Sequence, residues 1–177
     1  KINHNSKSSL ISRESNIFTH NIFLSASLII VFIGTILPLI HSEIGLGIIS
    51  IGAPFFDEMF FYLFIPFAIF IGLSPFVKWR KQNLSQHKSS ILLAIFLTLI
   101  SFIILYSINK NLLFSFKISL SLFIIISAVI HFISIKKYDM SYLNMQLAHI
   151  SLAILAIGIF TVNAYRIDKE VVLKVGQ

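Results

Sequence analysis

Five long apolar runs constrain this chain more than any other feature. They cover residues 21–40, 59–77, 91–108, 118–135 and 145–164, and none contains Asp, Glu, Lys or Arg. A helix rises about 1.5 Å per residue, so about 20 residues cross the roughly 30 Å hydrocarbon layer of a bilayer. Backbone groups in lipid must be hydrogen-bonded within the protein, and a single helix achieves this. We therefore predict an all-α integral membrane protein, a bundle of five transmembrane helices.

The composition agrees with a membrane protein and excludes several other classes. Only 12% of the 177 residues are charged, against about 25% in an ordinary soluble domain. This excludes a cytosolic enzyme, a disordered chain and a nucleic-acid-binding protein, although the net charge is +7. There is no cysteine, which excludes disulfides, Cys-based metal sites and a thiol nucleophile in this chain.

The basic residues predict the orientation in the membrane. Nine of the 14 Lys and Arg residues lie before the first run or after the second and fourth runs, and the other five lie after the third and fifth runs. Positive loops stay in the cytoplasm, so segment 1–20 is expected there and segment 165–177 on the outer, periplasmic side. The Val-rich tail, with Val171, Val172 and Leu173 between charged residues, predicts the start of a β-rich outer domain. Between the third and fourth runs we expect a short turn over residues 109–117.

The predicted outer loop 41–58 is unusually apolar for a solvated segment. It has three Gly and one Pro, but also Ile48, Ile49, Phe55 and Phe56. One interpretation is an interfacial loop that dips into the headgroup region. The other is a platform that covers a hydrophobic ligand at the outer face. Its Gly-Leu-Gly does not indicate dinucleotide binding, because no strand precedes it and the third Gly of that fingerprint is missing.

Two histidines lie inside predicted spans and are the candidates for chemistry. His131 lies near the end of the fourth run, and His149 lies near the start of the fifth. Because the two helices run in opposite senses, both imidazoles are expected at a similar depth. They could ligate one haem iron together, or each could hydrogen-bond to a neighbouring helix. The weaker candidates lie in loops or at span edges: His4, His20, His41 and His87.

Several collinear motifs resemble one known family. They are Ser12-Arg13-Glu14-Ser15 with Asn21, the Gly34–Leu39 stretch GTILPL, Gly45–Gly52 followed by Pro54-Phe55-Phe56, Pro66 with Gly72 and Pro75, and Ala148-His149. Together they resemble the CcmF/NrfE family, the membrane subunit of the bacterial cytochrome c haem lyase. The chain does not begin with Met and its tail ends within a polar pattern. We therefore expect an internal part of a longer protein, inactive by itself.

The resemblance implies a haem b and one of its ligands. His149 matches a membrane histidine that ligates the iron of this haem b, whereas His131 has no recognised counterpart. The opposite ligand, the outer haem-ligand histidines and the Trp-rich outer motif of the family would lie outside this chain, so no catalytic residue is assigned. On the predicted cytoplasmic side, Arg80, Lys136 and Lys137 could meet the haem propionates.

The resemblance also implies the reaction, the partners and the membrane. The expected activity is covalent attachment of haem to the CxxCH motif of apocytochrome c. The expected partners are the haem chaperone CcmE, CcmH/CcmI-type subunits, apocytochrome c and lipid of the bacterial inner membrane, with no nucleic acid. The alternative is a non-catalytic haem carrier, transporter or scaffold subunit. A transporter would be expected to show broken helices with polar groups at the midplane, and the apolar runs show no such pattern.

Overall fold

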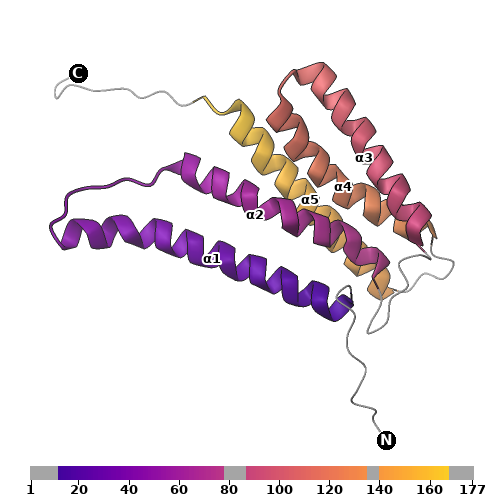
Figure 1. Ribbon diagram of the computed structural model, residues 1–177, viewed down its shortest axis with the longest axis horizontal. Coiled ribbons are helices and arrows are strands. Elements are labelled where there is room, and N and C mark those ends of the chain that lie inside the picture. The colour runs from indigo at the N-terminus through magenta and orange to yellow at the C-terminus, as the bar shows by residue number, and fades with distance from the viewer. Residues whose placement is uncertain (1–11, 78–86, 135–139, 168–177) are drawn as a thin grey trace, which may run out of the picture.

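The computed structural model describes residues 12–77, 87–134 and 140–167. These residues form five α-helices, α1 (Arg13–Glu43), α2 (Ala53–Leu73), α3 (Lys88–Asn109), α4 (Leu112–Ser134) and α5 (Met140–Tyr165), with a short 3-10 helix η1 (Ser74–Phe76) after α2 (Figure 1). No strand occurs in this part of the chain. The all-helical prediction is therefore confirmed for the described residues. Of the predicted β-rich start at residues 165–177, Tyr165 is the last residue of α5, residues 166–167 form no strand, and residues 168–177 lie outside the described part of the chain.

All five helices are long and apolar enough to cross a membrane. They make this a multi-pass membrane protein. The apolar windows of α1 and α3 are the most exposed, with only 6% of each buried inside the bundle, against 44% for α4. Side chains such as Leu28 and Ile103 therefore face outward, as expected for helices that contact lipid or another protein.

The first two helices begin before the apolar runs that predicted them. The first helix begins at Arg13 rather than at residue 21, because the Ser12 hydroxyl accepts a hydrogen bond from the Ser15 amide at 3.2 Å. The second begins at Ala53, with Pro54 in its first turn, where the missing proline N–H is not needed. Residues 13–20 and 53–58, expected outside the spans, are therefore helical.

The turn between α3 and α4 is shorter than the predicted turn over residues 109–117. Lys110 ends α3 in the left-handed conformation with φ 54°, and the Asn111 side chain accepts a hydrogen bond from the Phe114 amide at 3.0 Å. These two residues reverse the chain, so Lys117 lies inside α4 and is only 9% exposed. Its ammonium group lies 4.7 Å from the ring centroid of Phe61, a cation–π contact that replaces part of its lost hydration.

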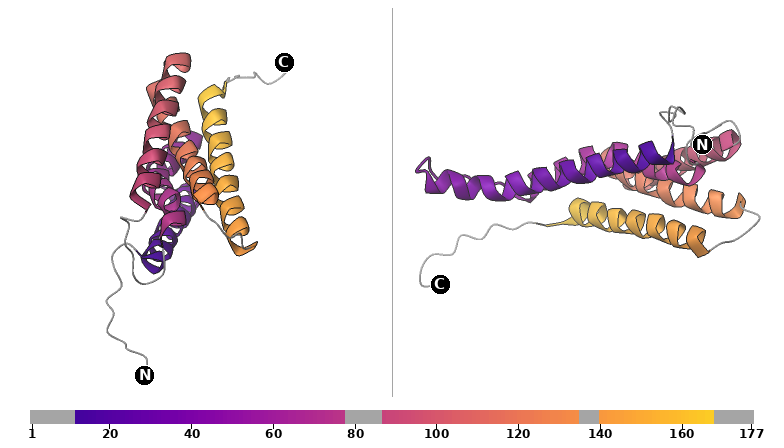
Figure 2. Two further views of the ribbon diagram at one scale, coloured as in Figure 1. Left: turned by 90° about the vertical axis from the view of Figure 1, so that its right-hand side faces the viewer. Right: turned by 90° about the horizontal axis from the view of Figure 1, so that it is seen from below.

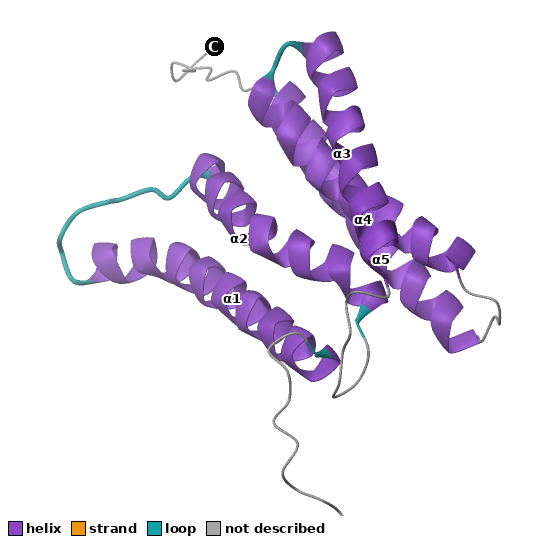
Figure 3. Ribbon diagram, turned by 45° about the vertical axis from the view of Figure 1, so that its right-hand side comes forward, coloured by secondary structure: helices purple, strands orange, loops and turns teal. Residues whose placement is uncertain are grey.

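Helix α4 lies at the centre of the bundle, and α1 lies at its edge. Helix α4 packs against α2, α3 and α5, whereas α1 packs chiefly against α2. Figure 2 shows α4 between α3 and α5, and Figure 3 shows α1 and α2 side by side. The buried core comes mainly from α2, α4 and α5, and its largest members include Phe64, Ile124 and Phe160.

One glycine fixes how closely two of these helices approach. A Cβ atom added at Gly72 of α2 would overlap the ring of Phe123 on α4. By contrast, a Cβ added at Gly158 of α5 would meet nothing within 4 Å. The contact at Gly72 lies where α2 ends, at the end of the bundle that also contains His131.

Candidate functional site

The candidate site lies at one end of the bundle, where α1, α3 and α5 begin and α2 and α4 end (Figure 1). We call this the histidine end, because His20, His87, His131 and His149 all lie in this half. The opposite end, where Gly45 and Gly47 connect α1 to α2, is the glycine-loop end.

His149 of α5 has one ring nitrogen fixed and the other available. Its Nδ1 lies 2.7 Å from the backbone oxygen of Met145, one turn earlier in the same helix. A carbonyl oxygen can only accept, so Nδ1 carries the proton and Nε2 keeps its lone pair. Histidines that ligate metals show this arrangement, in which the second ring nitrogen donates to a carbonyl and fixes the tautomer. The half-buried imidazole therefore fits an axial ligand of a haem iron.

His131 of α4 has a different environment. Its Nδ1 lies 2.9 Å from the Nε2 of Gln146 on α5, and both side chains are buried. The amide N–H donates, so Nδ1 accepts and the ring proton is on Nε2. The rings of Phe76, His87 and Tyr142 surround it at centroid distances of 5.4 to 6.4 Å. This is the hydrogen bond to a neighbouring helix that was one of the two interpretations of this residue.

Helix α1 contributes two residues, Arg13 and His20, that were not assigned to this site from the sequence. The Nη2 of Arg13 lies 3.5 Å from the Sδ of Met145, so the start of α1 meets the start of α5. His20 packs edge-on against the Phe67 ring of α2, with a centroid distance of 5.3 Å, and it is close enough to His149 for an electrostatic interaction. Its Nε2 is buried and has no hydrogen-bond partner among the described residues.

From the sequence alone, His20 was a weak candidate at a span edge. One signal was present: Arg13 and His20 are about two turns apart, which places them on one face of a helix. Which helix that face meets could not be read from the sequence. The three cations expected near propionates, Arg80, Lys136 and Lys137, lie outside the described residues.

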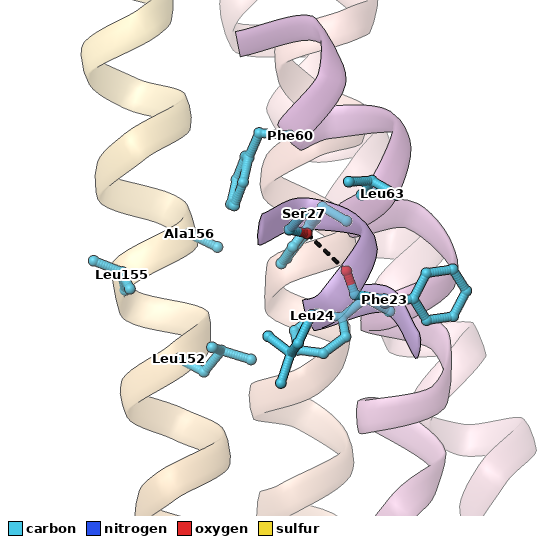
Figure 4. Close-up of a pocket in the computed structure, with 10 residues that line it drawn as sticks. Phe23, Leu24, Ser27, Phe60, Leu63, Leu152, Leu155 and Ala156 are labelled. Atoms are coloured by element: carbon cyan, nitrogen blue, oxygen red, sulfur yellow. Dashed lines mark hydrogen bonds between the residues drawn. The ribbon is translucent and has the colours of Figure 1, made fainter. Parts of the chain in front are cut away.

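An apolar pocket of about 200 Å³ adjoins the histidines, between α1, α2 and α5 (Figure 4). Phe23 of α1 and Leu152 of α5 line it, one turn beyond His20 and His149 respectively. Ser27 also lines the pocket, but its hydroxyl group donates a hydrogen bond to the backbone oxygen of Phe23 at 2.8 Å. The walls are otherwise hydrocarbon or aromatic, so the pocket suits an apolar group.

At the glycine-loop end, the ring of His41 is held by the loop itself. His41 Nδ1 lies 2.8 Å from the backbone oxygen of Gly47, to which it donates. Gly45 and Gly47 have φ of 74° and 101°, a region that favours glycine. Phe55 and Phe56, expected in a loop, lie in the first turns of α2 and approach Gly34 of α1. His41 therefore anchors the connection between α1 and α2.

Comparison with known proteins finds relatives along nearly the whole chain. The cytochrome c-type biogenesis protein CcmF of Haemophilus influenzae is 34% identical over 180 residues, which is 94% of this chain and 28% of that protein. CcmF of Escherichia coli is 31% identical, over 99% of this chain and 28% of the relative. CycK of Rhizobium meliloti, also a cytochrome c-type biogenesis protein, is 27% identical over 94% of this chain.

The chain spans little more than a quarter of the length of these relatives. No family model and no solved structure matches it. The relatives nevertheless cover the helices, the glycine loop and the histidine end together. The resemblance seen in the motifs is thus confirmed, and this chain is, along nearly its whole length, a relative of the CcmF family of cytochrome c-type biogenesis proteins.

Proposed function

We propose that this chain takes part in cytochrome c maturation as a membrane part of a haem lyase, and that His149 binds the iron of a haem b. The observation that carries the proposal is the hydrogen bond from His149 Nδ1 to the Met145 carbonyl. It leaves Nε2 as the metal-binding nitrogen and holds the ring in a fixed orientation. The names of the relatives support the maturation role.

The surroundings of His149 support a ligand that is apolar over most of its area and anionic at one edge. The pocket lined by Phe23, Phe64 and Leu152 offers hydrocarbon and aromatic contacts one helical turn beyond His149. Arg13, at the start of α1, interacts electrostatically with His149 and supplies positive charge on the other side. A haem combines these two characters, because its macrocycle is apolar and its propionates are carboxylates.

The proposed division of labour explains why the chain needs no cysteine. In haem attachment, the thiols of a CxxCH motif in apocytochrome c add across the haem vinyl groups, so the substrate supplies the sulfur. The iron of the substrate haem must be ferrous, and a membrane haem b supplies one-electron chemistry when bound. The task proposed for this chain is to bind and orient that haem through His149. The haem chaperone CcmE, CcmH/CcmI-type subunits and apocytochrome c are the proposed partners.

We also propose that the histidine end faces the cytoplasm and the glycine-loop end faces the periplasm, in a bacterial inner membrane. By sequence, nine of the 14 Lys and Arg residues lie before or at the start of α1 or around the connections from α2 to α3 and from α4 to α5, and five, among them Lys110 and Arg166, lie around the connection from α3 to α4 or after α5. This distribution follows the preference of basic residues for the cytoplasmic side.

The test is His149→Ala in the whole protein, with His131→Ala as the matched control. We expect the first variant to lose most bound haem b and to abolish holocytochrome c formation, whereas the second keeps the haem. Absorption spectra of the purified proteins and haem staining of mature cytochrome c measure both effects. Retention of a normal low-spin spectrum by His149→Ala would refute the haem assignment. Loss of haem without loss of holocytochrome c would favour the carrier or scaffold alternative.

A further inference from the structure

His20 has an unusual environment for a histidine in a membrane helix. It lies in α1, its Nε2 is buried, and no described residue is within hydrogen-bonding distance of that nitrogen. An imidazole nitrogen that is withdrawn from water without a partner costs free energy. No described residue satisfies this nitrogen, and a bound group that offers an acceptor would do so.

His20 lies on the part of α1 that is near His149 of α5. Phe23 and Leu152, which lie three residues after His20 and His149 respectively, line the same pocket, so the two histidines lie on facing parts of α1 and α5. Arg13, about two turns before His20 on the same helix, contacts Met145, whose carbonyl oxygen holds the His149 ring. Two side chains of α1 that can donate hydrogen bonds therefore lie beside the segment of α5 that presents the free Nε2 of His149.

We propose that His20 is a positioning residue of this site, whose Nε2–H donates a hydrogen bond to a carboxylate of the haem that His149 binds. This inference rests on the function proposed above. A carboxylate is the partner that fits, because Arg13 places positive charge along the same edge and no described Asp or Glu hydrogen-bonds to His20. In this arrangement α5 provides the iron ligand and α1 provides hydrogen-bond donors for the anionic edge.

The competing explanation is that His20 serves only to pack. Its ring contacts Phe67 edge-on, at an interplanar angle of 76°, and an aromatic ring of any kind could do this. Two substitutions separate the explanations, because each keeps one property of the imidazole. His20→Phe keeps the ring and removes the N–H, whereas His20→Gln keeps an N–H donor and removes the ring.

The experiment compares both variants with wild type and with His131→Phe, in the whole protein purified in detergent. Haem b per polypeptide, its affinity and its midpoint potential are measured, and size-exclusion chromatography with far-ultraviolet circular dichroism confirms that the helices are retained. We expect His20→Phe to weaken haem binding by roughly tenfold or more, the loss typical of one hydrogen bond to a charged group. Its midpoint potential should fall, because the unpaired carboxylate charge favours ferric iron. His20→Gln should restore most of both values.

Three results would overturn this inference. Normal haem binding by His20→Phe with a loss in His20→Gln would show that the ring serves packing only. Failure of Gln to rescue relative to Phe would remove the hydrogen bond from the explanation. A five-coordinate, high-spin spectrum in both variants would make His20 an iron ligand instead. The proposed function is tested separately by His149→Ala, whose effects on haem content and holocytochrome c formation do not depend on the role of His20.

Discussion

The two ends of the bundle differ in how completely their polar side chains are paired. At the glycine-loop end, Arg166, which directly follows α5, lies 3.4 Å from Asp57 of α2, and the Tyr165 hydroxyl donates to Asn109 of α3 at 3.3 Å. Four buried side-chain atoms lack a hydrogen-bond partner among the described residues, and all four lie in the histidine half: Asn16 Oδ1, His20 Nε2, Ser127 Oγ and Gln146 Oε1. Among the described residues, buried side-chain atoms without a partner therefore occur in the histidine half and not at the glycine-loop end. This difference teaches that polar pairing within the described bundle is less complete around the candidate site than at the opposite end.

The largest loss of stability is expected from Gly72→Ala, which forces a methyl group into the Phe123 ring. Overpacking of a close helix contact costs roughly 1–3 kcal/mol, and the overlap here places the variant near the upper limit. Because α2 and α4 meet at the histidine end, haem content should fall as well. Thermal unfolding in detergent and the absorption spectrum measure the two effects.

Gly158→Ala is the matched control, since an added methyl group there meets nothing within 4 Å. Alanine is favoured over glycine inside a helix by about 0.5–1 kcal/mol, so this variant should be neutral or slightly more stable. Equal destabilisation by the two substitutions would contradict the close approach of α2 and α4.

A medium effect is expected from Gln146→Leu, which removes the partner of the buried His131 Nδ1. A buried polar group left unpaired costs about 1–3 kcal/mol. In the double variant with His131→Phe the cost should be smaller than the sum of the single effects, because the hydrogen bond is lost only once. Thermal unfolding of the four proteins completes the cycle. Simple additivity would show that Gln146 and His131 do not interact.

The smallest effect is expected from Asp57→Asn at the glycine-loop end. The ion pair with Arg166 is partly exposed, with side chains 25% and 33% accessible, so its loss should cost less than about 1 kcal/mol. Haem content should stay unchanged, because the pair lies at the end of the bundle away from His149. A clear loss of haem in this variant would break the distinction between the two ends.

The sequence predicted the helices well because apolar length decides whether a segment can span lipid. It did less well at the boundaries, where single polar residues decide. The Ser12 cap extends α1, and the Lys110-Asn111 reversal brings Lys117 into α4. Apolar runs mark the part of a helix that faces hydrocarbon, whereas capping hydrogen bonds mark where the helix begins and ends.

The candidate site could be predicted only in part. The rarity of ionisable groups in spans identified His149 and His131. The contacts of His20, Arg13 and Gln146 depend on how the helices rotate against one another, and helices that are apolar on all sides carry little periodic signal to fix that rotation. The environment of these three residues therefore required the structure.

The number of spanning helices affects the free energy of charge movement across the membrane as well as the topology. Five crossings are an odd number, so residues 12 and 167 face different aqueous compartments when all five helices span the bilayer. The histidine end and the glycine-loop end then differ in electrical potential. Moving one charge across the full membrane changes its free energy by about 2.3 kcal/mol per 100 mV. The free energy of moving an electron from a group near His149 to a partner beyond the glycine loop would therefore depend on the membrane voltage.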